Sequence, residues 1–495
     1  MKGKKAKKLA AGIMSAVMMC AASSSVYAAS PSGISLGSVK ESESAICFYD
    51  FEDGDVSAFS KRGNTDTSVI SAYEDSVQGN VMAVTGRTKN WNGPQIRVDT
   101  ILEPGVKYTV SAKVKTAWYN TVNISMQKND AEGNASYSNL AKGVSQGDWV
   151  TISTKFTFSQ TEGSTYLYIE GSDGADLYVD DFSIEAEPET HPESDIAGLK
   201  DVYAKYFKFG TAVTESELAP SATKELILKH FNSITLGNEL KPENMLDKAG
   251  CIANAEAGNG GEVSVKLNNS ARTVLNFARD NNISVRGHVL VWHSQTPDWF
   301  FKENYADDGD WVDKETMLKR MENYIKNVFA TLEEEYPTVN FYAWDVVIEA
   351  WLDDGSARKP GGYNTNPNTS GWVQVLGDNS FIEPAFEYAR KYAPEGCKLY
   401  YNDFNEYIDG KTNAIVKMAN ELKEKGLIDG IGMQSHLDVS FPGISAYKKA
   451  LEKFAGTGLD IQVTELDATT SDTSEAGFEA QAKYYSDIMD ACVEY

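Results

Sequence analysis

The sequence predicts two folded domains of different class, an all-β sandwich followed by an α/β domain built as a (β/α) barrel. Short alternating strand-like runs fill residues 45–185 without a helical period. After Leu199, apolar strand-like runs alternate with amphipathic helices seven times, as in a closed parallel sheet. Polar residues collect at the ends of those runs, where the mouth of a barrel lies.

Residues 1–28 predict a secretory signal peptide and therefore an exported, extracellular protein. Five lysines precede an apolar stretch from Leu9 to Ala22, and Val26 and Ala28 occupy the small-residue cleavage positions. The apolar stretch is too short for a mature membrane span. Cys20 raises the alternative of a lipoprotein, but Met19 is a poor residue in front of a lipidated cysteine.

Residues 44–186 predict a jelly-roll sandwich. Runs such as "KYTVSAKVKTAW" and "WVTISTKFTF" alternate apolar and polar residues and are separated by clusters of Gly, Asn, Asp and Ser. The stretch "EAEPETHPES" that follows is rich in Pro and Glu and has no apolar periodicity. It predicts a linker at residues 187–195.

Residues 196–495 predict the barrel. Strand-like runs such as "SVRGHVLVW" and "FYAWDVVIEA" alternate with helical runs such as "ETMLKRMENYIKNVFATLEEEY". Polar or charged residues follow or end these strands: Asn238, Lys241, His293, Glu349, Asp403, Gln434, His436 and Glu465. Any one of them could be a satisfied interior group, but the recurrence on six of the seven strands favours a functional site.

Composition and motifs exclude several functions. The formal net charge of −25 argues against nucleic acid or an anionic membrane as the main partner. The sequence has no His/Cys/carboxylate spacing typical of a metal site and no G-x-S-x-G motif of a serine hydrolase. The first barrel turns also lack a glycine-rich loop that could bind phosphate. The aromatic content, with 9 Trp, 25 Tyr and 20 Phe, suits sugar recognition.

Two carboxylates remain as the candidate chemistry. Glu349 ends the apolar run "WDVVIEAW", and Glu465 lies in "TELD" on the seventh strand. A pair of carboxylates on facing strands can hydrolyse a glycosidic bond, one protonating the leaving oxygen and the other acting as nucleophile or activating water. His293 and His436 suit sugar hydroxyls, or alternatively are buried structural histidines.

The barrel motifs resemble those of glycoside hydrolase family 10, the retaining endo-β-1,4-xylanases. The similarity is in "FNSITLGNELKPENM", "VRGHVLVWHSQTPDW", "WDVVIEA", "YYNDFN", "GIGMQSHLD" and "QVTELD". It implies a (β/α)8 TIM barrel that acts on xylan and xylo-oligosaccharides and requires no cofactor. It also implies Glu349 as acid/base and Glu465 as nucleophile. The implied sugar-binding residues are Asn238, Lys241, His293, Gln434 and His436.

The N-terminal domain resembles family 22 carbohydrate-binding modules, which bind xylan. The similar segments are "FEDGDVSAFSKRGN", "VTGRTKNWNG", "LEPGVKYTVSAKVK" and "LYVDDFSIE". By that resemblance the cleft would be lined by Arg62, Trp91, Tyr137, Tyr166 and Glu170, although Trp91 could instead be a core aromatic. Glu52 and Asp181 are candidates for a structural calcium site or for surface salt bridges.

Two departures from the family pattern matter. The family has asparagine before its acid/base glutamate, where this chain has Ile348, so a bond to the 2-hydroxyl of the reacting sugar is lost. In addition, seven βα units are found where the family has eight, which predicts a barrel truncated before strand eight. Two alternatives therefore stay open: a catalytically weak or silent xylan-binding protein, and a barrel hydrolase for another β-glucan.

Overall fold

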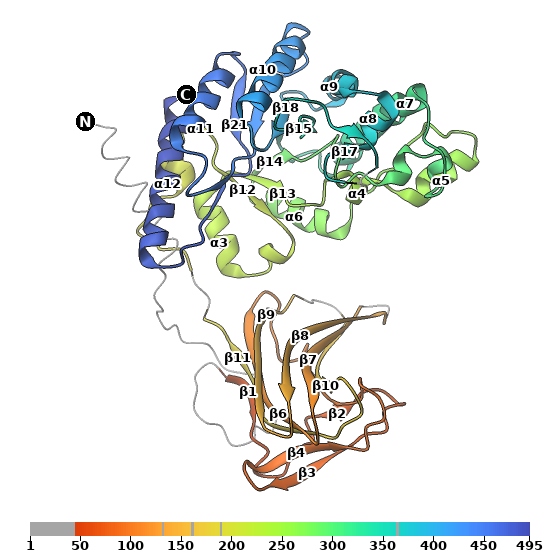
Figure 1. Cartoon of the computed structure of the whole chain (residues 1–495), viewed down its shortest axis with the longest axis vertical. Helices are drawn as coiled ribbons and strands as arrows, with labels where there is room; N and C mark the ends of the chain where they lie inside the picture. Colours follow the sequence, from red (N-terminus) through yellow and green to blue (C-terminus); the bar gives the residue numbers. More distant parts are fainter. Residues whose placement is uncertain (1–44, 131–132, 160–162, 189–190, 363–365) are drawn as a thin grey trace. The chain divides into compact units, whose positions relative to one another are not determined.

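The computed structural model describes residues 45–130, 133–159, 163–188, 191–362 and 366–495. The predicted signal peptide lies outside these residues. The chain divides into two compact units, one mainly N-terminal to Pro192 and one mainly C-terminal to it (Figure 1).

The N-terminal unit is a β-sandwich of two antiparallel sheets. The strands are β1 (Ala45–Tyr49), β2 (Ser60–Lys61), β3 (Val69–Asp75), β4 (Gly79–Thr85), β5 (Pro94–Arg97), β6 (Lys107–Thr116), β7 (Asn120–Asn129), β8 (Ala135–Ser145), β9 (Val150–Thr157), β10 (Ser164–Gly171) and β11 (Leu177–Ala186). One sheet has the order β3-β4-β11-β6-β9, with β1 also paired to β11, and the other β2-β5-β10-β7-β8.

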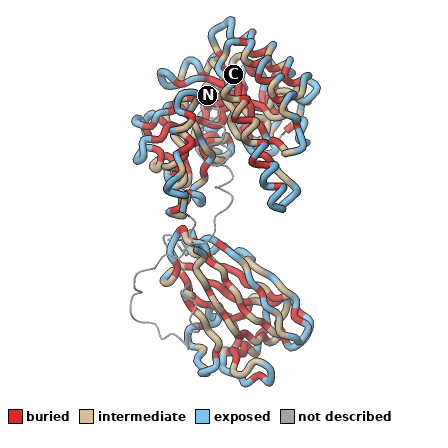
Figure 2. The backbone as a smooth tube through the Cα atoms, turned by 90° about the vertical axis from the view of Figure 1, so that its left-hand side faces the viewer, coloured by how far each residue is buried: buried red, intermediate tan, exposed pale blue. Residues whose placement is uncertain are grey.

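Alternation along the strands builds the core of the sandwich. In β6, Tyr108, Val110, Ala112 and Val114 are buried while the residues between them are partly exposed. Successive strand residues point to opposite faces, so each sheet gives one apolar face to the shared core. The resulting alternation of burial along the strands is visible in Figure 2.

The C-terminal unit is a (β/α) barrel domain. In the described part of the chain, seven parallel strands pair in the order in which they occur: β12 (Gly210–Val213), β13 (Ser233–Leu236), β14 (Ser284–Gly287), β15 (Phe341–Ile348), β18 (Lys398–Asp403), β19 (Gly430–Met433) and β21 (Asp460–Val463). The predicted combination of a β-sandwich with a barrel of the (β/α) type is confirmed.

Helices follow the strands and surround the sheet (Figure 1). They are α2 (Leu199–Val202), α3 (Ser221–His230), α4 (Pro242–Met245), α5 (Lys248–Glu256), α6 (Asn269–Asp280), α7 (Lys314–Glu335), α8 (Gly371–Leu376), α9 (Ile382–Tyr392), α10 (Asp409–Glu424), α11 (Ile444–Ala455) and α12 (Glu475–Glu494). In α7, Asp313 caps the first turn through Thr316 N, and one face is buried at helical spacing, including Met317, Met321 and Val328.

Short elements extend the mouth of the barrel. The 3-10 helices are η1 (Ser216–Leu218), η2 (Asp298–Phe301), η3 (Glu303–Tyr305) and η4 (Asn379–Phe381), and β16 (Lys359–Pro360) pairs with β17 (Thr369–Ser370). Beyond β19 and β21, β20 (His436–Asp438) pairs with β22 (Asp467–Thr469), which sets His436 opposite Asp467.

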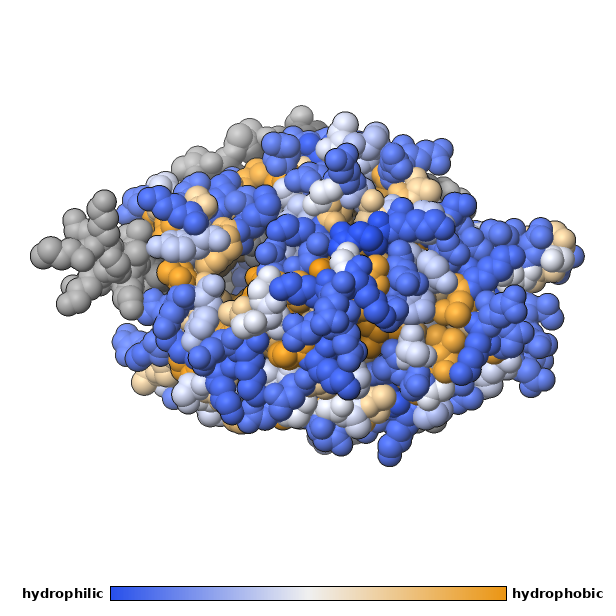
Figure 3. Space-filling model, turned by 90° about the horizontal axis from the view of Figure 1, so that it is seen from above, coloured by the Kyte–Doolittle hydropathy of each residue, from blue (hydrophilic) through white to orange (hydrophobic). Residues whose placement is uncertain are grey.

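The face of the molecule seen from above is mostly hydrophilic, with apolar residues in small separate patches (Figure 3). This distribution agrees with the acidic composition of the chain. Among the described residues, none of the helices is both long enough and apolar enough to span a bilayer.

Candidate active site

The carboxyl ends of the barrel strands bring the predicted site residues to one mouth. Glu349 directly follows β15, Gln434 directly follows β19, and Glu465 and Asn238 each lie two residues beyond their strands. Carboxyl ends of parallel strands meet at the same edge, so residues distant in sequence converge there. Three predicted residues lie further along the chain: His293 in the loop after β14, Lys241 at the start of α4, and His436 on β20.

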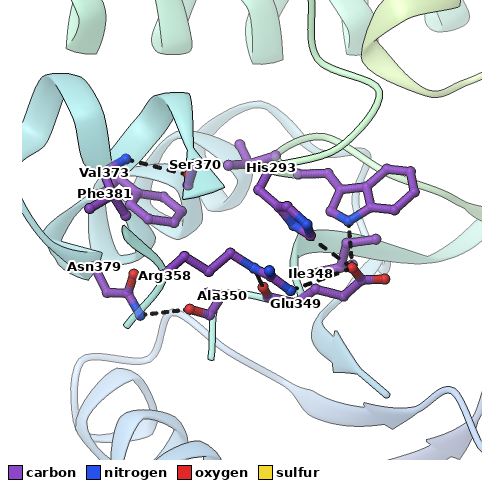
Figure 4. Close-up of a pocket in the computed structure, with 11 residues that line it drawn as sticks. His293, Ile348, Glu349, Ala350, Arg358, Ser370, Val373, Asn379 and Phe381 are labelled. Atoms are coloured by element: carbon purple, nitrogen blue, oxygen red, sulfur yellow. Dashed lines mark hydrogen bonds and ion pairs between the residues drawn. The ribbon is translucent and has the colours of Figure 1, made fainter. Parts of the chain in front are cut away.

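Hydrogen bonds hold the carboxylate of Glu349 in place. Trp292 Nε1 donates to its Oε2 at 2.9 Å, and Gln434 Nε2 donates to its Oε1 at 3.0 Å. Arg358 donates to the backbone carbonyl of Glu349 at 2.5 Å, and its guanidinium lies 3.9 Å from the carboxylate (Figure 4). Glu349 has a φ of 55°, a conformation that costs free energy unless its surroundings fix it.

His293 approaches Glu349 as a neutral imidazole. Its Nδ1 lies 3.7 Å from the Glu349 carboxylate (Figure 4) and has no hydrogen-bond partner within the described residues. Burial, together with the positive charges of Arg358 and Lys411, lowers the pKa of His293 to about 3. The ring is therefore uncharged at neutral pH and can bond to a neutral group, such as a sugar hydroxyl.

Glu465 is held as a carboxylate. Burial would raise its pKa, but the hydrogen bond with His436 and the charges of His288 and Arg286 outweigh burial and lower the pKa to about 2. His436 Nε2 lies 3.3 Å from one carboxylate oxygen, and Asn402 Nδ2 donates to the other at 2.9 Å. Glu465 is therefore anionic throughout the neutral range.

His436 bridges two carboxylates. Its Nε2 faces Glu465, and its Nδ1 lies 2.9 Å from Asp467. The bond with Glu465, supported by Asp467 and opposed by burial, raises the pKa of His436 to about 9. A doubly bonded, protonated imidazole at this position fixes the orientation of Glu465.

A buried network lies behind Glu465, and the sequence reasoning missed it. Arg286 donates two hydrogen bonds to Asp345, and His288 Nδ1 lies 2.9 Å from the same carboxylate. Atoms of His288, Asp345 and Glu465 that could bind a metal lie within 4.8 Å of one another. Because Arg286 already neutralises Asp345, the set is better suited to orienting Glu465 than to holding a cation.

Lys241 connects the two carboxylates electrostatically. Its Nζ donates to Asn238 at 2.8 Å and to Gln295 at 3.0 Å, and lies 5.2 Å from the ring centre of Trp292. Burial lowers the pKa of Lys241, and the negative charges of Glu465 and Glu349 both oppose that shift. Since one ammonium senses both glutamates, both belong to the same mouth.

Ile348 is buried next to the acid/base candidate. It is only 2% exposed and pairs in register with Asn402 on β18. It lines a small pocket together with Val373, Phe381 and residues of the segment around Trp292 (Figure 4). Its side chain offers no polar atom to a substrate.

On the sandwich, one face of the sheet β2-β5-β10-β7-β8 gathers four of the five residues predicted to bind sugar, Arg62, Tyr137, Tyr166 and Glu170, whereas the fifth, Trp91, is half-buried. Arg62 forms an ion pair with Glu170 at 3.5 Å and donates to the carbonyl of Trp91 at 3.1 Å. The Arg62 guanidinium carbon lies 5.8 Å from the ring centre of Tyr137, which is 62% exposed. Tyr166 joins the same face through its register with Gln127.

Two further members of this face were missed from the sequence. The ring centre of Tyr168 lies 3.4 Å from the guanidinium carbon of Arg62, and the hydroxyl of Ser125 donates to Glu170 at 2.9 Å. The strand period could have revealed Tyr168, because Tyr166, Tyr168 and Glu170 alternate along β10 and so share a face.

Comparisons with known proteins agree with both units. Residues 198–495 match the model of glycosyl hydrolase family 10, and residues 44–176 match a carbohydrate binding domain model. The chain is 41% identical to endo-1,4-beta-xylanase Y of Acetivibrio thermocellus, over 86% of this chain and 40% of that protein. It is 35% identical to endo-1,4-beta-xylanase A of Thermotoga maritima, over 86% of this chain and 39% of that protein.

Among solved structures, the chain resembles the CBM22-1-GH10 modules of Clostridium thermocellum xylanase 10B, determined in complex with xylohexaose. The TM-score is 0.58 at 38% identity, covering 91% of this chain and 88% of that one. The chain spans about two fifths of the length of these two curated relatives.

Proposed function

Because the chain belongs to glycosyl hydrolase family 10, we propose that it is a retaining endo-1,4-β-xylanase that cleaves internal bonds of xylan. The observation that carries the proposal is the pairing of an anionic, histidine-held Glu465 with Glu349, bonded by Trp292 and Gln434, at one mouth. Export, as proposed from residues 1–28, suits a polymer too large to enter a cell.

In the proposed mechanism Glu465 is the nucleophile and Glu349 is the acid/base. Glu465 attacks the anomeric carbon while Glu349 gives its proton to the departing glycosidic oxygen, which leaves a covalent glycosyl-enzyme and a shortened chain. Glu349, now ionised, then takes a proton from water as the water oxygen attacks the same carbon and releases Glu465. Two displacements restore the original anomeric configuration.

Reducing-end release from soluble beechwood xylan tests the activity, and proton NMR of the first products tests the stereochemistry. We expect β-anomers first, followed by slow mutarotation. The appearance of α-anomers first would show that the mechanism is inverting rather than retaining.

The same assay tests the second candidate function, a catalytically silent xylan-binding protein, which the buried apolar side chain of Ile348 supports. That candidate would be favoured if no reducing ends were released while xylan binding was retained. Faster cleavage of β-glucan than of xylan would identify the chain as a hydrolase of another β-glucan.

We further propose that the aromatic face of the sandwich binds xylan. Tyr137→Ala should weaken xylohexaose binding by about 5–10-fold, because a stacking aromatic contributes roughly 0.5–1.5 kcal/mol beyond its area. Tyr137 is 62% exposed, so the fold should be unaffected. Tyr73→Ala is the matched control, since Tyr73 is 48% exposed but lies on β3 of the other sheet. Equal losses in both variants, measured by calorimetry, would contradict the assignment.

A buried carboxylate, Asp180, lies near the two calcium candidates of the sandwich, Glu52 and Asp181. Asp181 pairs with Lys113 at 2.6 Å, whereas its neighbour Asp180 is 3% exposed and its Oδ1 has no hydrogen-bond partner within the described residues. Burial and the charge of Asp181, with a smaller contribution from Glu52, raise the pKa of Asp180 to about 6. We propose that Asp180 would bind a calcium ion together with one neighbouring carboxylate, Glu52 or Asp181, and that the ion would offset the negative charge of this region.

Calcium should therefore stabilise the sandwich. At a hundredfold excess over Kd, binding adds about 2.7 kcal/mol, a rise in the Tm of the sandwich transition of roughly 5–10 °C. Scanning calorimetry of the full chain in calcium and in EGTA measures the difference. Asp180→Asn should abolish it, and an equal Tm in both buffers for the unchanged chain would exclude the site.

A further inference from the structure

Ser435 lies between the two side chains that hold the catalytic candidates. Gln434 donates to Glu349 at 3.0 Å, and His436 Nε2 lies 3.3 Å from Glu465. Ser435 itself is fully buried and has a φ of 59°. Since the backbone at one residue directs the side chains before and after it, the conformation of Ser435 sets both contacts together.

The hydroxyl of Ser435 fixes this conformation. Its Oγ donates to Glu406 Oε1 at 3.0 Å and lies 2.8 Å from the hydroxyl of Tyr447 and 3.4 Å from the carbonyl of Met433. A left-handed backbone at a residue other than glycine persists only where the surroundings over-determine it. Here the hydrogen bonds of one hydroxyl supply that constraint.

Glu406 is the ionisable member of this set. It lies in the turn between β18 and α10, is fully buried, and, within the described part of the chain, bonds Ser435 rather than either catalytic candidate. Its Oε2 has no hydrogen-bond partner within the described residues. A buried carboxyl with one unsatisfied oxygen is costly, so its retention calls for a reason beyond packing.

We propose that Glu406 is a positioning residue that, through Ser435, orients Gln434 and His436 against Glu349 and Glu465. The inference rests on the proposed function, because it takes these two glutamates as the reacting pair. Glu406 touches neither substrate nor the reacting atoms. It acts by fixing the one backbone residue on which both contacts depend.

The charge state of Glu406 makes this positioning sensitive to pH. Burial, with the negative charge of Asp403, raises the pKa of Glu406 to about 7, against the opposing effects of its own backbone amide, Ser435 and Lys411. The carboxyl is therefore neutral at pH 6 and ionises above pH 7. The titratable and charged groups around it are Asp403 on β18, Lys411 on α10, Tyr407 in the same turn and Tyr447 on α11.

Ionisation places a second buried negative charge beside Asp403. Movement of the turn and of Ser435 lowers the free-energy cost of this buried charge, because water can then reach the unsatisfied oxygen of Glu406. We expect the alkaline side of the activity profile to include this transition.

The direct test is the pKa of His436, measured by NMR with carbon-labelled histidine, since the chain has only five histidines. In the unchanged chain we expect the value of about 9 that the bond to Glu465 produces. In Glu406→Leu the pKa should fall by at least about one unit toward the ordinary value as the contact loosens. Glu406→Gln, which keeps an acceptor for Ser435, should restore it.

Ile415→Ala is the control for destabilisation alone. Ile415 is fully buried on α10 and its side chain has no polar atom that could bond Ser435 or Glu406, so this variant should lower the Tm without moving the pKa of His436. An unchanged pKa in Glu406→Leu would overturn the proposal and leave Glu406 as part of the packing. This readout needs no hydrolysis, so it also decides the matter if xylan is not cleaved.

Activity gives the second measurement. Glu406→Gln should keep kcat/KM at pH 6 within about threefold and extend the alkaline limb by at least about half a pH unit, because the titrating group is gone. Glu406→Leu should lose at least about tenfold at every pH. Identical pH profiles for the unchanged chain and Glu406→Gln would overturn the pH dependence.

Discussion

Replacing Glu465 with glutamine should lower kcat/KM on soluble xylan by at least about 10⁴-fold. Loss of a nucleophile in other enzymes costs factors of this size or larger. Glutamine keeps the shape of the side chain but can neither attack the anomeric carbon nor carry the negative charge. The structure suits the proposed role of Glu465 as nucleophile, because His436 and Asn402 each bond one of its oxygens and its pKa is lowered to about 2. The assay is reducing-end release at pH 6.

Asp467→Asn is the matched control for this change. Asp467 faces the other nitrogen of His436, at 2.9 Å, and is 55% exposed. Removing its charge perturbs the same imidazole without removing the nucleophile, so we expect a loss of no more than about tenfold. If Glu465→Gln kept more than about one hundredth of the activity, another group would have to be the nucleophile.

The fold was predictable because the hydrophobic patterns that mark its strands and helices are local features of the sequence. Strands and helices of the barrel alternate along the chain, and neighbours in sequence are neighbours in the sheet. The position of Glu349 after an apolar strand was equally visible, since the end of a strand is a feature of the sequence itself. The same argument found Gln434 and Glu465.

The support around these residues was not predictable, because it depends on contacts between distant segments. Asp345 was as informative as Glu349, being a charge inside the apolar run of β15, but its partners Arg286 and His288 are nearly sixty residues away. Likewise, nothing local connects Asn402 with Glu465 or Glu406 with Ser435. Such pairs become evident only when the strands are placed side by side.

Ile348→Asn should raise kcat/KM on xylan by about 100-fold. The family's asparagine at this position bonds the 2-hydroxyl of the reacting sugar, and such bonds strengthen in the transition state by several kcal/mol. Restoring about 3 kcal/mol corresponds to a hundredfold gain or more. The position suits this role, since Ile348 precedes Glu349 and pairs with Asn402 at the end of β18. Initial rates on beechwood xylan, with KM measured separately, test the gain.

The gain should carry a cost in stability. Ile348 is 2% exposed and shares its pocket with Val373 and Phe381, so an amide without a partner there costs about 1–3 kcal/mol in the absence of substrate. We therefore expect Ile348→Asn to be faster but to melt at a lower temperature. Ile348→Leu, which keeps the volume and adds no polar atom, should gain no activity. A lower Tm without faster cleavage in Ile348→Asn would contradict the proposed bond to the 2-hydroxyl. No cleavage by either chain, with xylan binding intact, would place the function in the sandwich rather than in the barrel.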